Sequence, residues 1–294
     1  MARLAIGLTG TVLALFFAAL TLGPAQIGAL ESLRALFAGD AGPLTLVMRE
    51  IRLPRAILAV MVGASLGLAG AAMQGYLRNP LAEPGLIGVS GSAALGAVIA
   101  IQTGLAASVF LGLPAMALIG ALLGVILVVA LAGPRGSSLT LILAGIAISA
   151  LAAALTSLVL NLSPNPFAAN EIVFWMMGSL ADRSMTHVWI ALPFMAVGWV
   201  MLATLGRGLD ALTLGEDAAG AMGIGLGRLR LTLILGTASV VGAATAVAGA
   251  IGFVGLVVPH ILRPFVGAQP SRLLWASAVG GAIMVLAADI AVRL

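Results

Sequence analysis

The chain has 294 residues, of which 62% are hydrophobic and only 8% carry a charge. A soluble domain carries about 25% charged residues, so lipid must be the solvent for most of this chain. All 14 basic residues are arginine, which excludes the lysine-containing phosphate-binding loop, so any ATP hydrolysis takes place on another chain. The absence of cysteine excludes disulfides, and the net charge of +4 reflects scattered loop arginines rather than a nucleic-acid surface.

Apolar runs without charges mark the predicted membrane spans, each of which needs about 20 helical residues. The first run could alternatively be a cleaved signal peptide. Residues 31–55 predict an extramembrane loop with a short amphipathic helix, and residues 171–188 an amphipathic interfacial segment. The sequence thus predicts an all-α, polytopic membrane protein with a single domain over 1–294 and nine spans. Six complete spans are expected at about 4–23, 56–77, 139–161, 188–205, 231–250 and 273–293. Two more lie within 85–134 and separate near "LGLPAM", and one broken span lies within 252–267.

The arginines favour an orientation with the N-terminus in the cytoplasm, although the bias is weak. In that orientation the other side carries Arg34, Arg49, Arg52, Arg55 and Arg183, interleaved with acids. The cytoplasmic side then carries Arg3, Arg78, Arg135, Arg207, Arg228, Arg230 and Arg272.

Two stretches suggest an internal repeat. "GASLGLAGA" (63–71) and "GAATAVAGA" (242–250) match at five of nine positions, and at the same offset two leucines and two prolines also coincide. Coincidence between two Ala/Gly-rich helices is one explanation. The other is a duplication inserted in opposite orientation, with repeat halves at about 54–161 and 231–294, which is a common transporter architecture with broken helices.

The segment "LTLGEDAAGAMGIGLGRLRL" (212–231) is charged and rich in glycine within an otherwise apolar chain. Glu216 and Asp217 stand where they could cap a short helix. From the residues alone, an ordinary solvated loop is the simplest interpretation.

Four further residues are polar within apolar surroundings. Asp289 is costly in lipid and should face protein or water. His260 is expected to pack or to cap a helix, since the chain has only two histidines and offers no metal-binding cluster. Gln74 and Asn79 are expected to satisfy backbone groups around the "RNP" turn.

Several phrases, in this order, resemble the FecCD-type permeases of ATP-binding cassette (ABC) importers, which carry iron–siderophore complexes, haem or cobalamin. They are "RLPRAILAVMVGASLGLAGAAMQGYLRNPLAEPGLIGVSGSAALG" (52–96), "LILAGIAIS" (141–149), "FWMMGSL" (174–180), "LTLGEDAAGAMGI" (212–224), "GAIGFVGLVVPHILRPFVG" (249–267) and "LAADIAVR" (286–293). The resemblance implies a homodimer in the bacterial inner membrane with a central pathway. It also implies a cytoplasmic ATPase under each subunit, a substrate-binding protein outside, no cofactor and no catalytic residue.

The resemblance also implies roles for particular residues. Residues 212–227 would be the segment that couples to the ATPase, folded as two short helices, with Leu214, Gly215, Glu216, Asp217, Ala218, Gly220, Met222 and Gly223 as its candidate contacts. Arg52, Arg55 and Arg293 match arginines that dock the binding protein, although interface anchoring would explain the first two equally. Ser137 and Ser138 match a cytoplasmic gate, although serine in a turn is unremarkable.

The chain departs from the family at its end, because relatives continue for about thirty residues with a tenth span. The sequence is therefore either truncated or a natural short form. Two other functions remain open: an ion-gradient-driven secondary transporter, for which Asp289 is the one candidate ionisable residue, and a structural membrane protein without transport.

Overall fold

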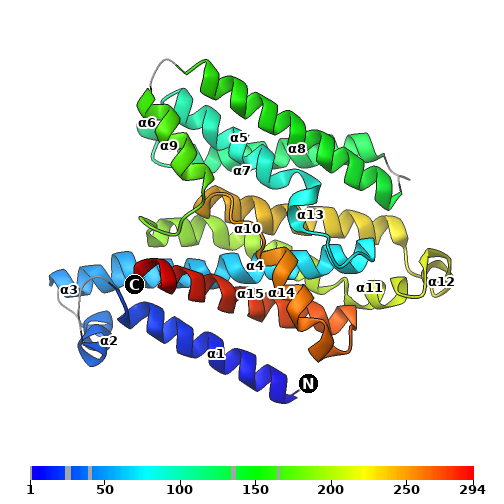
Figure 1. The fold of residues 1–294 in the computed structure, drawn as a ribbon, viewed down its shortest axis with the longest axis horizontal. Helices are drawn as coiled ribbons and strands as arrows, with labels where there is room; N and C mark the ends of the chain where they lie inside the picture. The colour runs from blue at the N-terminus through cyan, green and yellow to red at the C-terminus, as the bar shows by residue number, and fades with distance from the viewer. Residues whose placement is uncertain (1, 24–27, 39–41, 134–136, 164–165) are drawn as a thin grey trace.

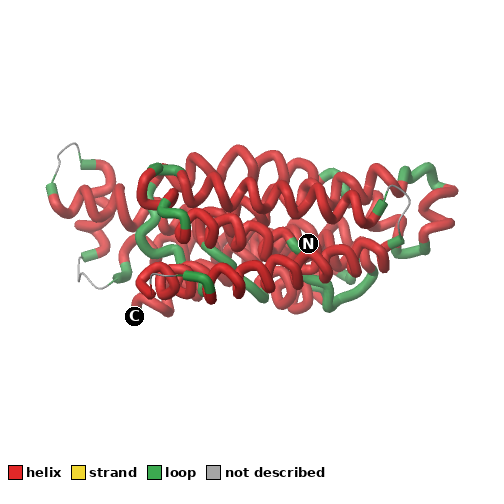
Figure 2. Tube along the Cα trace, turned by 90° about the horizontal axis from the view of Figure 1, so that it is seen from above, coloured by secondary structure: helices red, strands yellow, loops and turns green. Residues whose placement is uncertain are grey.

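The computed structural model describes residues 2–23, 28–38, 42–133, 137–163 and 166–294, and across these ranges the protein is helical without any strand. The long helices run roughly along the long axis of the molecule, whereas short helices such as α6 and α9 cross it (Figures 1 and 2). In chain order they are α1 (Ala2–Thr21), α2 (Ala29–Phe37), α3 (Pro43–Leu46), the π-helix η1 (Val47–Arg52), α4 (Leu53–Leu77), the 3-10 helix η2 (Pro84–Ile87), α5 (Val89–Gln102), α6 (Leu105–Ser108), α7 (Gly112–Ala132), α8 (Ser138–Asn161), α9 (Pro166–Met176), α10 (Met185–Ala203), α11 (Gly206–Leu212), α12 (Glu216–Ala221), α13 (Leu226–Ala248), α14 (Val254–Leu262), the 3-10 helix η3 (Pro264–Val266) and α15 (Pro270–Arg293).

Within the described ranges, seven helical stretches are long and apolar enough to cross a membrane, so the predicted count of nine spans is not confirmed. The two that fall short are α5, with 14 residues, and α14, with nine. At 1.5 Å per residue, α5 extends only about 21 Å. Helix α14 corresponds to the broken span that the sequence predicted within 252–267. It starts after Phe253, which has a left-handed backbone conformation, and ends before Pro264.

Two stretches differ from the predicted loops. Residues 43–52 are helical and continue directly into α4, so this stretch is 35 residues long from Pro43 to Leu77. The other is α9, which begins at Pro166 and so starts before the amphipathic segment that the sequence predicted at 171–188. A proline in the first helical turn has no N–H to leave unpaired, so Pro43 and Pro166 can begin helices.

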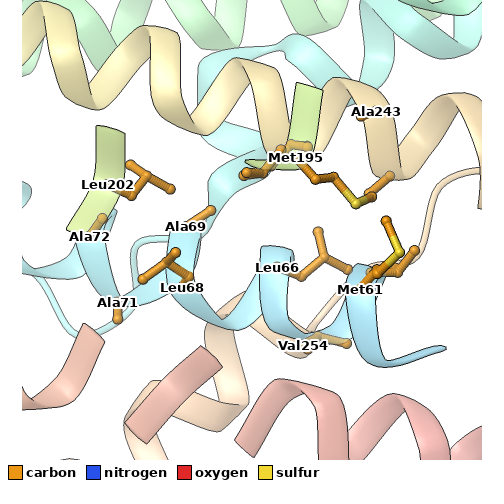
Figure 3. Close-up of a cluster of buried hydrophobic side chains, with 14 of the residues drawn as sticks. Met61, Leu66, Leu68, Ala69, Ala71, Ala72, Met195, Leu202, Ala243 and Val254 are labelled. Carbon is orange, nitrogen blue, oxygen red and sulfur yellow. The ribbon is translucent and has the colours of Figure 1, made fainter. Parts of the chain in front are cut away.

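The core lies around α4, which packs along α15 and against α13, α14 and α10. Figure 3 shows this core, in which Met61, Leu66 and Leu68 of α4 lie among side chains of three other helices. These are Met195 and Leu202 of α10, Ala243 of α13 and Val254 of α14. Glycines bring the helices into backbone contact. A Cβ on Gly63 would lie 2.3 Å from the carbonyl oxygen of Gly281, and one on Gly70 would lie 1.9 Å from that of Gly255. Gly63 and Gly70, two of the small residues that the matched stretches share, therefore serve close helix packing.

The two ends of the bundle carry different elements. Figure 1 places α12 at one end, and α2, α3 and the C-terminus at the opposite end. We name these the α12 end and the α2–α3 end. Helix α4 runs toward the α12 end, whereas α13 runs away from it, so the two matched stretches lie on antiparallel helices.

Candidate functional site

The α12 end carries a small projecting segment formed by residues 213–223. Helix α12 has six residues and stands between Gly215, with φ 105°, and Gly223, with φ 82°. Both glycines adopt backbone conformations that side chains disfavour, which permits the two sharp turns. Leu214 and Met222 expose 70% and 53% of their surfaces, while Ala219 is buried beneath them. The segment therefore presents apolar side chains on a knob beyond the spans (Figure 1).

Within 212–227 the structure contains one short helix, α12, before α13 begins at Leu226. The other short helix, α11, ends at Leu212, so the two short helices expected within 212–227 are not both inside it. Glu216 and Asp217 occupy the first turn of α12, where negative charge complements the helix dipole. Ala218 is half-buried and Gly220 is exposed. The predicted contact residues thus lie on one small surface.

One ion pair joins this segment to α4. Arg78 Nη2 lies 3.9 Å from Glu216 Oε1, and both side chains are about half exposed. Exposed pairs contribute about 0–1 kcal/mol, so this contact holds α12 only weakly. Arg78 itself ends α4 in the left-handed conformation, where its N–H donates to the carbonyl of Gln74.

The predicted gate residues lie at the start of α8. Ser137 is its N-cap, and its Oγ accepts a hydrogen bond from the N–H of Thr140 at 3.2 Å. Ser138 is the first residue of the helix and is half-buried. Gly136, which precedes the two serines, lies outside the described residues. The start of α8 is at the α12 end in Figure 1.

The three predicted docking arginines gather at the α2–α3 end, but they do not form an exposed rim. Arg52 is 5% exposed, and its Nη1 donates to the carbonyls of Leu20 and Thr21 at 2.9 and 3.1 Å. These carbonyls belong to the last turn of α1, which lacks intrahelical partners for them. Arg52 therefore caps α1 from the neighbouring helix.

Arg55 and Arg293 both bind Asp289. Arg55 Nε donates to Asp289 Oδ1 at 2.7 Å, while the Nη2 of Arg293 contacts the other carboxylate oxygen. Arg293 Nη1 also donates to the carbonyl of Ala19 at 3.0 Å. The prediction that Asp289 faces protein is confirmed. We call Arg52, Arg55, Asp289 and Arg293 the arginine cluster, and it joins α1, α4 and α15.

Two adjoining cavities lie beside the loop that separates α13 from α14. One, of about 180 Å³, is lined by Glu83, Pro84 and Phe253, among others. The other, of about 260 Å³, reaches Arg55 and Asp289. Ile251 and Gly252 line both cavities. Arg55 and Asp289 were candidates from the sequence, whereas Ile251, Gly252 and Phe253 were not, and a short Gly/Phe loop between two apolar helices was the signal for them.

Phe253 is unusual within that loop. It has φ 64° and exposes 70% of its surface, although it is a bulky residue at the start of α14. A bulky residue in the left-handed region costs about 1–3 kcal/mol, and such strain is frequent at functional sites. The ring therefore marks the loop as a candidate pathway element.

The remaining polar residues have structural partners. Asn79 Oδ1 accepts a hydrogen bond from the N–H of Leu81, as the sequence predicted for this turn. Gln74 instead joins α4 to α14. Its Nε2 donates to the backbone carbonyl of Leu256, and its Oε1 accepts from the side chain of Arg263, the C-cap residue of α14. His260 is exposed in the last turn of α14, so the packing prediction for it was wrong, whereas helix capping still fits. The described residues contain no group of potential metal ligands.

The fold and these two ends define a polytopic membrane transport protein. Residues 11–294 match the FecCD transport family. The chain is 39% identical over 261 residues to an uncharacterised ABC transporter permease protein, YvrB, of Bacillus subtilis. The aligned region covers 87% of this chain and 73% of YvrB. The chain is 40% identical over 253 residues to the cobalamin import system permease protein BtuC of Halobacterium salinarum, covering 84% of this chain and 66% of that one.

Two further comparisons agree. The hemin transport system permease protein HmuU of Yersinia pestis is 37% identical over 290 residues, covering 93% of this chain and 84% of that protein. A solved structure of an ABC transporter assigned to the metal-chelate type, in an inward-facing conformation, matches with a TM-score of 0.88 at 31% identity. It covers 100% of this chain and 91% of that one. The chain belongs to the FecCD transport family, which confirms the resemblance, and it is a multi-pass permease subunit of a transporter.

Proposed function

We propose that this protein is the membrane-spanning subunit of an ATP-driven importer for an iron chelate, such as a siderophore complex or haem, or for cobalamin. The observation that carries the proposal is the pairing of the family match with a compact, exposed α12 segment. Relatives named for cobalamin and hemin import support the substrate class. The bacterial inner membrane is the expected location.

The α12 segment is the proposed contact with a cytoplasmic ATP-binding subunit. Exposed Leu214 and Met222 give it apolar anchors, and Glu216 and Asp217 give it charge. Its small residues allow another protein to approach the backbone closely. Because the chain has no lysine for a phosphate-binding loop, the energy of ATP must reach it through such a contact.

The α2–α3 end is the proposed docking end for a substrate-binding protein. Arg55 is the arginine of the cluster that keeps the most exposed side chain, at 17%, so it is the proposed direct contact. Arg52 and Arg293 are engaged with α1 and Asp289, so we propose that they shape this surface. Rim charges of this kind mainly increase the rate of association and make it sensitive to salt.

A second copy of the chain is the proposed partner across the translocation pathway. The two cavities beside Ile251 and Gly252 are the proposed pathway lining of one subunit. Ser137 and Ser138, at the α12 end, are the proposed gate on the cytoplasmic side. The proposed inverted duplication fits the antiparallel course of α4 and α13.

A gradient-driven transporter usually needs an ionisable group that is free to bind and release its ion. Asp289 is the candidate for that role, but it is paired with two arginines near the end of α15. This pairing favours the ATP-driven mechanism.

Reconstitution of the chain with its cognate ATP-binding subunit and binding protein tests the proposal. We expect uptake of the chelate into vesicles to require ATP and to stop with an ATP-binding subunit that cannot hydrolyse it. Uptake that continues without ATP and follows an imposed ion gradient would contradict the proposal.

A further inference from the structure

Asp210 on α11 binds the beginning of α15, a helix that starts about sixty residues later in the chain. Its Oδ1 accepts a hydrogen bond from the backbone N–H of Ser271 at 2.8 Å. Its Oδ2 accepts one from Ser271 Oγ at 2.7 Å and one from Gln269 Nε2 at 2.9 Å. Both carboxylate oxygens are therefore used by a single helix end.

The first turn of a helix has N–H groups without intrahelical partners and a partial positive charge. Gln269, the N-cap residue of α15, provides no side-chain cap, and Pro270 has no N–H. Asp210 supplies the missing cap from another helix. The Asp210 carboxylate thus accepts hydrogen bonds from the uncharged donors of Gln269 and Ser271 and lies at the N-terminus of α15.

Packing reinforces the same junction. A Cβ built on Gly206 would lie 3.1 Å from the Cβ of Ser271, so the start of α11 touches α15 directly. Leu209 and Leu212 are buried on the same helix. Only three residues separate α11 from α12, which makes α11 the base on which the projecting segment stands.

We propose that Asp210 is a positioning residue that makes α11 and α15 move as one body, so that displacement of the α12 segment reaches α15. Helix α15 packs along α4 over much of its length and ends in the arginine cluster at the opposite side of the molecule. The Asp210 junction therefore connects the proposed ATPase contact to the proposed docking end. The exposed Arg78–Glu216 pair is too weak for this task. The inference rests on the proposed function.

The first test compares variants in the reconstituted complex, in which ATP hydrolysis and uptake are both measured. We expect Asp210→Ala and Ser271→Ala to bind the ATP-binding subunit and hydrolyse ATP, but to import about fivefold less substrate per ATP or worse, which is the lower range of typical coupling between sites. Asp210→Asn should recover much of the loss, because its amide oxygen still accepts from the Ser271 N–H. Thr204→Val is the matched control, since the Thr204 hydroxyl bonds only within the last turn of α10.

Unchanged uptake per ATP in Asp210→Ala would overturn the inference. If the wild-type chain binds no ATP-binding subunit or imports nothing, the proposed function itself fails. Failure of the Asp210 inference alone would instead show as normal uptake per ATP in the variant beside a functional wild-type chain. A variant that does not assemble leaves the decision to a second test.

The second test uses the absence of native cysteine. Gly206→Cys with Ser271→Cys places the two Cβ atoms near the spacing of about 3.5–4.5 Å that a disulfide needs. Ser271→Cys removes the hydroxyl that donates to Asp210, and the disulfide would tie the two helices together in its place. Because the helices move together in this account, the oxidised pair should import substrate at least as well as the reduced pair does. Loss of uptake on oxidation, with recovery on reduction, would show that α11 and α15 must separate and would overturn the inference.

Discussion

Arg55 on α4 donates a hydrogen bond to Asp289 on α15 across 2.7 Å, although 234 residues separate them in the chain. Arg293 binds the second oxygen of the same carboxylate and also caps α1. One acid therefore holds two arginines and, through them, three helices. This arrangement makes Asp289 a structural centre of the α2–α3 end.

Replacing Asp289 by Ala should destabilise the protein by about 3 kcal/mol, because removal of one partner from a buried pair leaves uncompensated charge. Arg55 and Arg293 would both lose their counter-ion. Thermal unfolding of the purified chain in detergent measures the effect. The double variant Asp289→Ala, Arg55→Ala should recover part of the loss. A Tm equal to that of the wild type in the single variant would contradict this assignment.

Gly70→Ala should separate α4 from α14, because the new Cβ would lie 1.9 Å from the carbonyl oxygen of Gly255. Overpacking of this kind costs about 1–3 kcal/mol. Gly10→Ala on α1 is the matched control, since a Cβ there meets nothing within 4 Å. The control should be neutral or slightly stabilising, because alanine favours helix over glycine by about 1 kcal/mol. Equal effects of the two substitutions on Tm would refute the close contact.

Charge reversal at Glu216 and Asp217, as Glu216→Lys with Asp217→Lys, should uncouple transport while the chain remains folded. Both residues are exposed, and the ion pair that Glu216 forms with Arg78 is weak. Co-purification with the ATP-binding subunit and uptake into vesicles provide the two readouts. Wild-type uptake in this variant would remove both residues from the coupling role.

The Asp210 cap should give stability a distinct pH dependence. Burial alone raises the pKa of Asp210, but hydrogen bonds from Gln269 and Ser271, with a smaller contribution from Arg272, lower it below its ordinary value. A carboxyl with a lowered pKa in the folded state contributes stability above its unfolded pKa of about 4, and this is lost as the pH falls through the folded value.

Asp210→Ala should therefore be less stable than the wild type by about 1 kcal/mol at pH 7, the typical contribution of a helix N-cap. The difference should persist down to about pH 4 and shrink below it. Thermal unfolding of both proteins between pH 7 and pH 3 checks this. A difference that grows on acidification would have the wrong sign.

Apolar runs were enough to predict the long helices, since lipid requires about 20 apolar residues for each crossing. They could not predict that α5 ends after 14 residues, because the following residues 103–111 are also apolar. The helical course of residues 43–52 was likewise missed. Charge there suggests a loop, but Arg52 is buried against the end of α1.

The glycines and acids of the projecting segment were enough to predict a break in the apolar chain, whereas its role as a coupling segment came from the family resemblance. The arginine cluster was not, since charge alone does not reveal a partner that is distant in sequence. Arg52, Arg55 and Arg293 were expected at an exposed docking surface, and their pairing with α1 and Asp289 emerges only from the fold. The same limit applies to Asp210 and Ser271.

The central claim is that the α12 segment faces the cytoplasm and receives the ATP-binding subunit. Leu214→Cys places one cysteine on the knob of a chain that has none, and it can be labelled with a membrane-impermeant thiol reagent. We expect labelling from the cytoplasmic face of vesicles and protection from it when the ATP-binding subunit is bound. Labelling from the external face, or labelling that the bound subunit leaves unchanged, would contradict the account.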